Sequence, residues 1–317
     1  MAGRCRRPSW AIVGLPPGCR LDDVSVRVTA LIAALILAAG VLAAPASAGD
    51  DPPGVVTFGG LPRTYVVHVP PGHPKGLVLN LHGAGQTGGD QAAVTNYNAV
   101  ADQHGFVVAY PDGIDLSWAD GRGASTPDRQ GIDDVGFLAA LIDRLTRDYG
   151  LPPGRAFVTG MSAGAFMATR LACERADLVA AIAPVAGTLG SEIPCTPSRP
   201  VSVLAVHGTA DPVVPYNGGP MVGRGGPSDV MAAPAMAERW RAVDQCPAPT
   251  QDTVGAVTRV SAAGCAGGTQ VVFVSIDGGG HTWPSGHVSL PAAMVGPTSF
   301  AFDASQASGQ FFAARAG

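Results

Sequence analysis

A serine between two glycines is the first candidate for chemistry in this chain. Residues 160–164 read Gly-Met-Ser-Ala-Gly, so Ser162 stands at the centre of a G-x-S-x-G pattern. The pattern alone is weak in a glycine-rich chain, and an ordinary strand-to-helix turn is its simpler explanation. A strand-like run at 155–159 and a helix-like segment at 163–176 surround it, however, which favours the sharp turn that presents a nucleophilic serine. The flanking glycines remove side chains that so tight a turn could not admit.

A serine hydroxyl becomes a strong nucleophile only when a base accepts its proton and an acid orients that base. Asp211 follows the strand-like run 201–206, and His281 follows the run 271–276 after three glycines. Both loops would lie at the same sheet edge as Ser162, because parallel strands end at one edge. We therefore predict that Ser162 is the nucleophile, Asp211 the orienting acid and His281 the base.

The other histidines and acids have simpler explanations. His207 stands close to a strand end and is predicted to be structural, and His82 precedes a glycine-rich loop whose backbone it could orient. Four further histidines without neighbouring signals are expected at the surface: His68, His73, His104 and His287. Three acids have local roles in turns or helix caps: Asp112, Asp133 and Asp134.

Two backbone N–H groups are candidates for stabilising a developing oxyanion, an interaction commonly worth about 3 kcal/mol per donor. One belongs to Ala163, directly after the serine. The other belongs to Ala84, in the loop 81–86 that reads Leu-His-Gly-Ala-Gly-Gln. A plain turn between a strand and a helix is the alternative for this loop.

Short apolar runs alternate with helix-like segments along the chain, which predicts an α/β fold with a mainly parallel central sheet and helices on both faces. The clearest helix spans 133–149, where Asp133 or Asp134 can cap the start and apolar residues recur at helical spacing. The weaker helices are expected at 163–176, 230–243 and 300–314. The predicted strands are 65–69, 76–81, 106–110, 155–159, 180–185, 201–206 and 271–276.

The amino-acid composition limits the number of domains and the kinds of partner. The chain has 317 residues, 46% of them hydrophobic and 14% charged, which is typical of one main domain. Its net charge of −4 and its single lysine, Lys75, leave no basic stripe for nucleic acid. We expect a monomer that needs no cofactor.

The first residues resemble a secretory signal peptide. Arg27 precedes the apolar run 28–44, and Ala46-Ser47-Ala48 is typical of a cleavage site. A membrane anchor is the alternative, although the run is short for a span. The preceding segment is unusual for a leader, so the true start could lie nearer Val26. We predict a signal peptide at 1–48, a single domain at 49–317, secretion and no stable membrane insertion after cleavage.

Four cysteines follow the leader: Cys173, Cys195, Cys246 and Cys265. In an exported protein they are expected to form disulfides, and buried free thiols are the alternative. Three pairings are possible, of which we favour the sequence neighbours, Cys173 with Cys195 and Cys246 with Cys265. No C-x-x-C or H-E-x-x-H pattern occurs, so no metal site is expected.

Several segments together resemble the esterase family that includes polyhydroxybutyrate depolymerases and feruloyl esterases. They lie at 81–87, 110–113, 133–137, 160–164, 207–216 and 278–284. The resemblance implies the α/β-hydrolase fold, a Ser162-Asp211-His281 triad and an oxyanion hole formed by Ala84 and Ala163. It also implies a secreted serine carboxylic ester hydrolase that works through an acyl-enzyme.

Two departures from the family affect the expected substrate. Polymer depolymerases usually have a cysteine at the position of Ala84, and they usually carry an additional substrate-binding domain, whereas this chain ends soon after His281. We therefore expect a soluble or polysaccharide-linked ester. Trp118 and Trp283 form an aromatic wall for the acyl group or, equally, pack loops. Acyl transfer by the same triad and a non-catalytic binding protein of the same fold are the alternative functions.

Overall fold

Strands that are buried on both faces form the centre of the structure. Every residue is buried in β3 (Gly76–Leu81), β4 (Phe106–Pro111) and β7 (Ser202–Gly208). Such continuous burial requires a layer on each side of the sheet. The computed structural model describes residues 53–316, and the predicted signal peptide at 1–48 lies outside them.

The large sheet has ten strands in the order β1-β2-β4-β3-β5-β6-β7-β12-β11-β10. The central strands from β4 to β12 pair in parallel, and antiparallel strands extend both edges. A separate hairpin is formed by β8 (Gly219–Gly223) and β9 (Gly226–Val230). The remaining strands are β1 (Gly54–Phe58), β2 (Leu61–His68), β5 (Ala156–Met161), β6 (Val179–Val185), β10 (Thr250–Val254), β11 (Val257–Ala263) and β12 (Gln270–Ile276).

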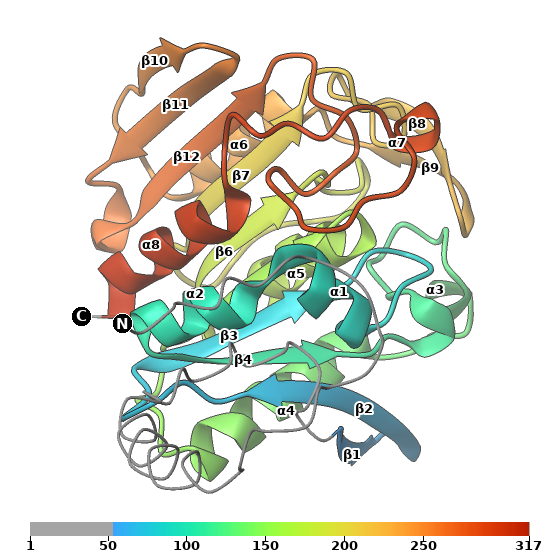
Figure 1. Cartoon of the computed structure of the whole chain (residues 1–317), viewed down its shortest axis with the longest axis vertical. Coiled ribbons are helices and arrows are strands. Elements are labelled where there is room, and N and C mark those ends of the chain that lie inside the picture. Colours follow the sequence, from blue (N-terminus) through green and yellow to red (C-terminus); the bar gives the residue numbers. More distant parts are fainter. Residues whose placement is uncertain (1–52, 317) are drawn as a thin grey trace, which may run out of the picture. The chain divides into compact units, whose positions relative to one another are not determined.

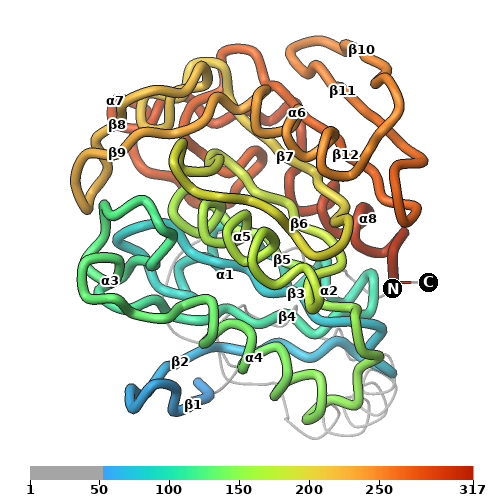
Figure 2. Tube along the Cα trace, turned by 180° about the vertical axis from the view of Figure 1, so that it is seen from behind, coloured from blue at the N-terminus to red at the C-terminus, as the bar shows by residue number. Residues whose placement is uncertain are grey.

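Helices cover both faces of the sheet, because alternate strand residues point to opposite sides. Leu77 and Leu79 pack on one side with α4, α5 and α6, while Val78 packs on the other with α1, α2 and α8. Figure 1 shows the second group in front of the sheet, and Figure 2 shows the first group from behind. The helices are α1 (Gly88–Thr95), α2 (Tyr97–His104), α3 (Thr126–Arg129), α4 (Asp134–Asp148), α5 (Ala163–Glu174), α6 (Ala233–Val243), α7 (Ala292–Val295) and α8 (Ala304–Ala316), with short 3-10 turns at Ile114–Leu116 and Ala266–Gly268.

The predicted α/β architecture is confirmed, and its seven strands and four helices are present with ends shifted by a few residues. At the start of α4, Asp133 caps the helix by accepting a hydrogen bond from the Gly136 N–H. Asp134 does not act as a cap. Its carboxylate is buried 2.6 Å from Nη2 of Arg63 and accepts a hydrogen bond from the Ala119 N–H.

Several elements have no equivalent among the predicted ones. The helices α1 and α2 have eight residues each, and α1 begins with two glycines, so neither gives a strong amphipathic signal. Thr87 and Asp90 nevertheless form a capping box at the start of α1. The hairpins β8–β9 and β10–β11 are short and largely exposed, and so lack the apolar runs that identify buried strands.

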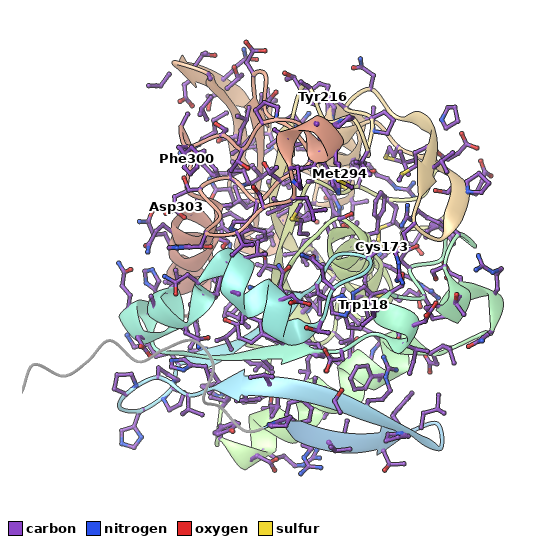
Figure 3. The ribbon with its side chains drawn as sticks, turned by 45° about the vertical axis from the view of Figure 1, so that its right-hand side comes forward. Trp118, Cys173, Tyr216, Met294, Phe300 and Asp303 are labelled. Atoms are coloured by element: carbon purple, nitrogen blue, oxygen red, sulfur yellow. A yellow bond between two sulfur atoms is a disulfide. The ribbon has the colours of Figure 1, made fainter. Side chains whose placement is uncertain are left out.

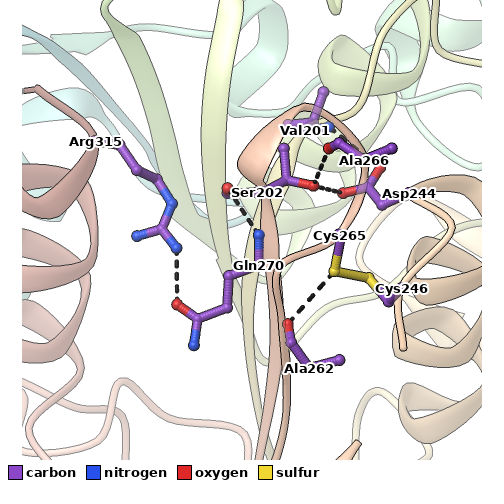
Figure 4. Close-up of a disulfide and its surroundings, with 10 residues drawn as sticks. Val201, Ser202, Asp244, Cys246, Ala262, Cys265, Ala266, Gln270 and Arg315 are labelled. Carbon is purple, nitrogen blue, oxygen red and sulfur yellow. Dashed lines mark hydrogen bonds between the residues drawn. A yellow bond between two sulfur atoms is a disulfide. The ribbon is translucent and has the colours of Figure 1, made fainter. Parts of the chain in front are cut away.

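The disulfides join Cys173 to Cys195 and Cys246 to Cys265, which confirms the favoured pairing. Figure 4 shows the second disulfide beside Asp244, the residue that ends α6. Within residues 53–316, no helix combines the length and the apolar character needed to cross a membrane.

Candidate active site

Ser162 occupies a strained turn between β5 and α5. Its backbone has φ 55° and ψ −120°, a conformation that non-glycine residues rarely adopt. The turn is tight on both sides. A Cβ atom at Gly160 would lie 2.7 Å from the carbonyl oxygen of Leu81, and one at Gly164 would lie 2.7 Å from that of His82. The glycines of the motif are therefore required by the close approach of β3 and the loop after it.

Asp211 lies in the loop after β7, at the carboxyl edge of the sheet. Its Oδ1 accepts hydrogen bonds from the backbone N–H groups of Val213 and Val214, each at 2.8 Å. These bonds fix the carboxylate and leave its second oxygen for another partner. Oδ2 lies 2.8 Å from Nδ1 of His281.

His281 lies in the loop after β12, and its ring joins the acid to the serine. Its Nε2 is 2.8 Å from Oγ of Ser162. Because a carboxylate only accepts hydrogen bonds, Nδ1 carries the proton toward Asp211 and Nε2 accepts from the serine hydroxyl. Asp211 and His281 are both buried, at 8% and 7% exposure, which limits competition from water. The three predicted residues thus form one hydrogen-bonded chain that can pass the serine proton to the imidazole.

Close packing of the backbone explains the glycines before His281 better than flexibility does. A Cβ atom at Gly280 would lie 2.6 Å from backbone atoms of Gly296, and one at Gly279 would lie 3.2 Å from Cα of Gly208. Only Gly278 of the three has a positive φ. The loop therefore carries the imidazole by fitting tightly between two backbone segments.

His207 is a structural histidine, as predicted. Its Nε2 is 3.0 Å from the carbonyl oxygen of Val214 and 3.4 Å from Oδ2 of Asp211. Burial lowers its pKa, which favours the neutral ring and donation to that carbonyl. It helps to hold the Asp211 loop but does not reach the serine.

His82 orients the glycine-rich loop, also as predicted. Its Nε2 accepts a hydrogen bond from the Gly113 N–H at 2.9 Å, so Nδ1 carries the proton and donates to the carbonyl oxygen of Gly83 at 2.8 Å. Burial lowers the pKa of His82 and so keeps the ring in this neutral form. The ring therefore joins the Gly83 carbonyl, next to Ala84 in the chain, to the backbone at Gly113.

The loop at 83–86 lies directly beside Ser162, the predicted nucleophile. A Cβ atom at Gly83 would be 3.5 Å from Cβ of Ser162. Ala84 and Ala163 both line the pocket at Ser162, and within the described residues neither of their N–H groups donates to a protein acceptor. Such free donors next to a nucleophile are available to a ligand oxygen.

A pocket of about 410 Å³ opens at Ser162. Its lining includes the turn of the β8–β9 hairpin with Met221, and residues of the segment 282–295 such as Leu290 and Met294. Met294, labelled in Figure 3, comes from α7 and is 62% exposed. Apart from Trp283, these parts of the lining were absent from the predictions, because glycine-rich turns and a loop carry no periodic signal.

The two tryptophans differ in their roles. Trp283 lines the pocket, and its Nε1 donates to Oγ of Ser305. Trp118, labelled in Figure 3, is fully buried, stacks on His82 and donates to the His82 carbonyl oxygen. The aromatic-wall prediction is therefore corrected for Trp118, which packs loops beneath the pocket. Among residues 53–316, no cluster of three or more histidine, cysteine or acidic side chains could hold a metal ion.

Comparison with known proteins places this site in a family. Residues 63–238 match the family model described as esterase PHB depolymerase. NocK of Nocardia uniformis subsp. tsuyamanensis, a protein classed as an esterase, is 31% identical over 265 residues, which cover 77% of each chain. Feruloyl esterase B of Piromyces equi is 32% identical over 215 residues, which cover 65% of this chain and 39% of that protein.

A solved structure supports the fold. The acetyl xylan esterase from Aspergillus awamori superposes with a TM-score of 0.53 at 17% identity, covering 73% of this chain and 94% of that one. The chain therefore belongs to the esterase PHB depolymerase family, and it is a carboxylic ester hydrolase with the α/β-hydrolase fold.

Proposed function

We propose that this protein is a secreted serine esterase that hydrolyses soluble or polysaccharide-linked esters through an acyl-enzyme. The observation that carries the proposal is the continuous hydrogen-bonded chain from Ser162 through His281 to Asp211, with both contacts to the imidazole at 2.8 Å. Nucleophile, base and orienting acid are in contact in the order that acyl transfer requires.

In the first half-reaction, Nε2 of His281 takes the Ser162 proton as Oγ attacks the ester carbonyl carbon. Asp211 holds the ring and stabilises the imidazolium that forms. The carbon–oxygen bond to the alcohol then breaks, and the proton on Nε2 passes to the leaving alcohol. In the second half-reaction His281 deprotonates the water that attacks the acyl carbon. The bond from that carbon to Oγ of Ser162 then breaks, and the proton on Nε2 passes to Oγ, which releases the acid and restores the serine hydroxyl.

The carbonyl oxygen gains negative charge in both tetrahedral intermediates. The N–H groups of Ala84 and Ala163 are the proposed donors to it, since both line the pocket and both lack a protein acceptor among the described residues. Ala163 is also the first residue of α5, where the positive end of the helix dipole favours an anion. His82 supports this arrangement by fixing the Gly83 carbonyl and the Gly113 N–H.

The proposed substrate class rests on the pocket and on the relatives. A largely apolar pocket of about 410 Å³ suits an acyl group of moderate size. Among the relatives are a feruloyl esterase and a bifunctional acetylxylan esterase/xylanase from Neocallimastix patriciarum. Trp283 is the proposed aromatic contact for the acyl group, because it lines the pocket. The two disulfides favour export to an oxidising compartment.

A fluorophosphonate probe tests the proposed nucleophile against the binding-protein alternative. We expect stoichiometric labelling at Ser162, located by peptide mass spectrometry, and no labelling of Ser162→Ala. The Ser198→Ala variant, changed at an exposed serine outside the pocket, serves as the control that should still be labelled. An unlabelled wild-type protein would contradict the proposal. Adding a sugar acceptor to the ester assay then separates hydrolysis from acyl transfer by the product that forms.

A further inference from the structure

A second, polar cavity adjoins the catalytic pocket. It has a volume of about 160 Å³ and shares four lining residues with that pocket: Ser117, Ser125, Arg224 and Gly225. The shared residues mean that one ligand could occupy both spaces. We call this cavity the polar annex. Figure 1 shows the elements that form it, α3 and the β8–β9 hairpin, on the same side of the structure.

Arg224 lies between the annex and the loop beside the nucleophile. It stands in the turn of the β8–β9 hairpin, and a Cβ atom at Gly85 would lie 3.3 Å from its Cδ and 3.5 Å from its Nε. Its Nη1 donates to the carbonyl oxygen of Asp115 at 3.1 Å. The guanidinium is therefore held against Gly85, one residue from the proposed oxyanion donor Ala84.

Arg129 supplies a second cation to the annex. It ends α3, and its Nη1 donates to the carbonyl oxygen of Gly225 at 3.0 Å, next to Arg224 in the chain. Among the described residues, neither Arg129 nor Arg224 forms a salt bridge. Both side chains are positioned by neutral carbonyl groups, so neither guanidinium is neutralised by an ion pair.

Arg122, which lines the catalytic pocket, differs from Arg129 and Arg224 because it forms a salt bridge. Its Nε and Nη2 donate to both carboxylate oxygens of the buried Asp120, so its charge is neutralised within the protein. The annex contains one carboxylate, Asp115, beside the two unneutralised arginines. One positive charge is left over, in a chain whose net charge is −4.

We propose that the annex binds a carboxylate on the substrate, so that preferred esters carry an anionic group on the part remote from the reacting carbonyl. Arg224 and Arg129 supply the charge, and the hydroxyl groups of Ser117 and Ser125 lie in the same lining. Guanidinium groups suit carboxylates because they donate several parallel hydrogen bonds. This inference rests on the proposed function, since it extends the pocket of Ser162.

Two pairs of esters with matched shape test it and show which end of the substrate carries the anion. Mono-4-nitrophenyl adipate and 4-nitrophenyl hexanoate differ in charge at the acyl end. 4-Butyryloxybenzoate and 4-methylphenyl butyrate differ in charge at the alcohol end. We expect kcat/KM to be about tenfold higher for the anionic member of at least one pair, and this preference to decrease with added salt.

Arg224→Gln and Arg129→Gln should each reduce that preference about tenfold, mainly through KM. Arg144→Gln is the matched control, because Arg144 is exposed on α4 and pairs only with Asp148. An equal kcat/KM within both pairs would overturn the inference. A preference that survives both annex variants would also overturn it.

A binding measurement separates this inference from the proposed function. Ser162→Ala protein, which should not turn over, is titrated with two matched pairs: monomethyl adipate with methyl hexanoate, and 4-butyryloxybenzoate with 4-methylphenyl butyrate. We expect tighter binding of the anionic ester in at least one pair, weakened about tenfold by Arg224→Gln. Equal binding within both pairs would overturn the annex even if Ser162 proves catalytic. Anion binding without Ser162-dependent hydrolysis would support the annex while the esterase mechanism fails.

Discussion

At the scale of single residues, the proposed catalytic groups are supported by neighbouring side chains and backbone groups outside the triad. His82 is the clearest example, since its two hydrogen bonds join Gly83 of the proposed oxyanion loop to Gly113 in the loop after β4. His207 and the backbone of Val213 and Val214 do the same for Asp211. The charged and nucleophilic groups are therefore held before a substrate arrives, which is the condition for effective electrostatic stabilisation.

Replacing His82 tests this support. In His82→Leu the buried Gly113 N–H loses its acceptor and the Gly83 carbonyl its donor, so the loop that carries Ala84 should shift. We expect kcat for a short 4-nitrophenyl ester to decrease about tenfold or more, with KM changed less than threefold. His73→Gln, at an exposed loop histidine, is the control that should retain wild-type kinetics. A lower kcat in the control, or an unchanged kcat in His82→Leu, would contradict the assigned role.

The hydrogen-bonded arrangement of the proposed triad could be predicted because each of its residues follows a recognisable strand. Ser162, Asp211 and His281 come after strands that end at one sheet edge, and their chemical types define the order of proton transfer. Trp118 was not predictable in the same way. Its burial against His82 depends on a loop that is held by contacts with residues farther away in the sequence, namely the His82 carbonyl oxygen and the Asp134 carboxylate.

At the scale of elements, the approach of α5 to β3 determines the shape of the nucleophilic turn. Gly164 lies against the Leu81 and His82 backbone, where no side chain fits. We expect Gly164→Ala to reduce the free energy of unfolding by about 2 kcal/mol or more, measured by chemical denaturation, because rigid backbone cannot yield to a new Cβ atom.

A glycine in an open helical position provides the comparison. Gly89 is exposed in α1, and a Cβ atom there would lie 3.7 Å from its nearest neighbour, Oγ1 of Thr87. Gly89→Ala should therefore leave stability unchanged or increase it by about 0.5–1 kcal/mol. If both variants lost stability equally, the close approach of α5 to the β3 backbone would not explain why residue 164 is glycine.

The central strands and long helices could be predicted, whereas the pocket walls could not. Buried β-branched runs and the apolar spacing in α4 arise from local sequence. The hairpin β8–β9 has exposed, glycine- and proline-containing strands, and its turn is shaped by the contact of Gly225 with Ala124, about a hundred residues earlier. The pocket walls that we propose to select the substrate therefore lie in the part of the fold with the weakest local signal.

At the scale of the whole molecule, Asp244 links the end of α6 to two strands of the sheet. Its carboxylate accepts hydrogen bonds from the Val201 N–H, before β7, and from the Thr269 hydroxyl, before β12 (Figure 4 shows Asp244 and Val201 beside the disulfide). Burial raises the pKa of Asp244 to about 6. The folded state thus binds a proton more tightly than the unfolded state does.

Stability should depend on pH through this group. The contribution of protonated Asp244 to the free energy of unfolding is fully present below about pH 4. It is lost as pH rises through about 6, because the carboxyl group ionises first in the unfolded state. Between pH 4 and 7 we expect wild type to lose up to about 3 kcal/mol of unfolding free energy relative to Asp244→Asn. Asp252→Asn, on the exposed strand β10, is the control. A pH-independent difference between wild type and Asp244→Asn would contradict the raised pKa.

The central claim is that Ser162 carries the acyl group, and the most direct measurement is kcat/KM for a short 4-nitrophenyl ester with wild-type and Ser162→Ala protein, both confirmed as folded by their thermal unfolding. Loss of the nucleophile in such triads reduces kcat by several orders of magnitude. We predict that kcat/KM decreases about 10⁴-fold or more. The remaining rate is the one that the oxyanion hole and substrate binding support without a nucleophile. Equal rates for the two proteins would contradict the account.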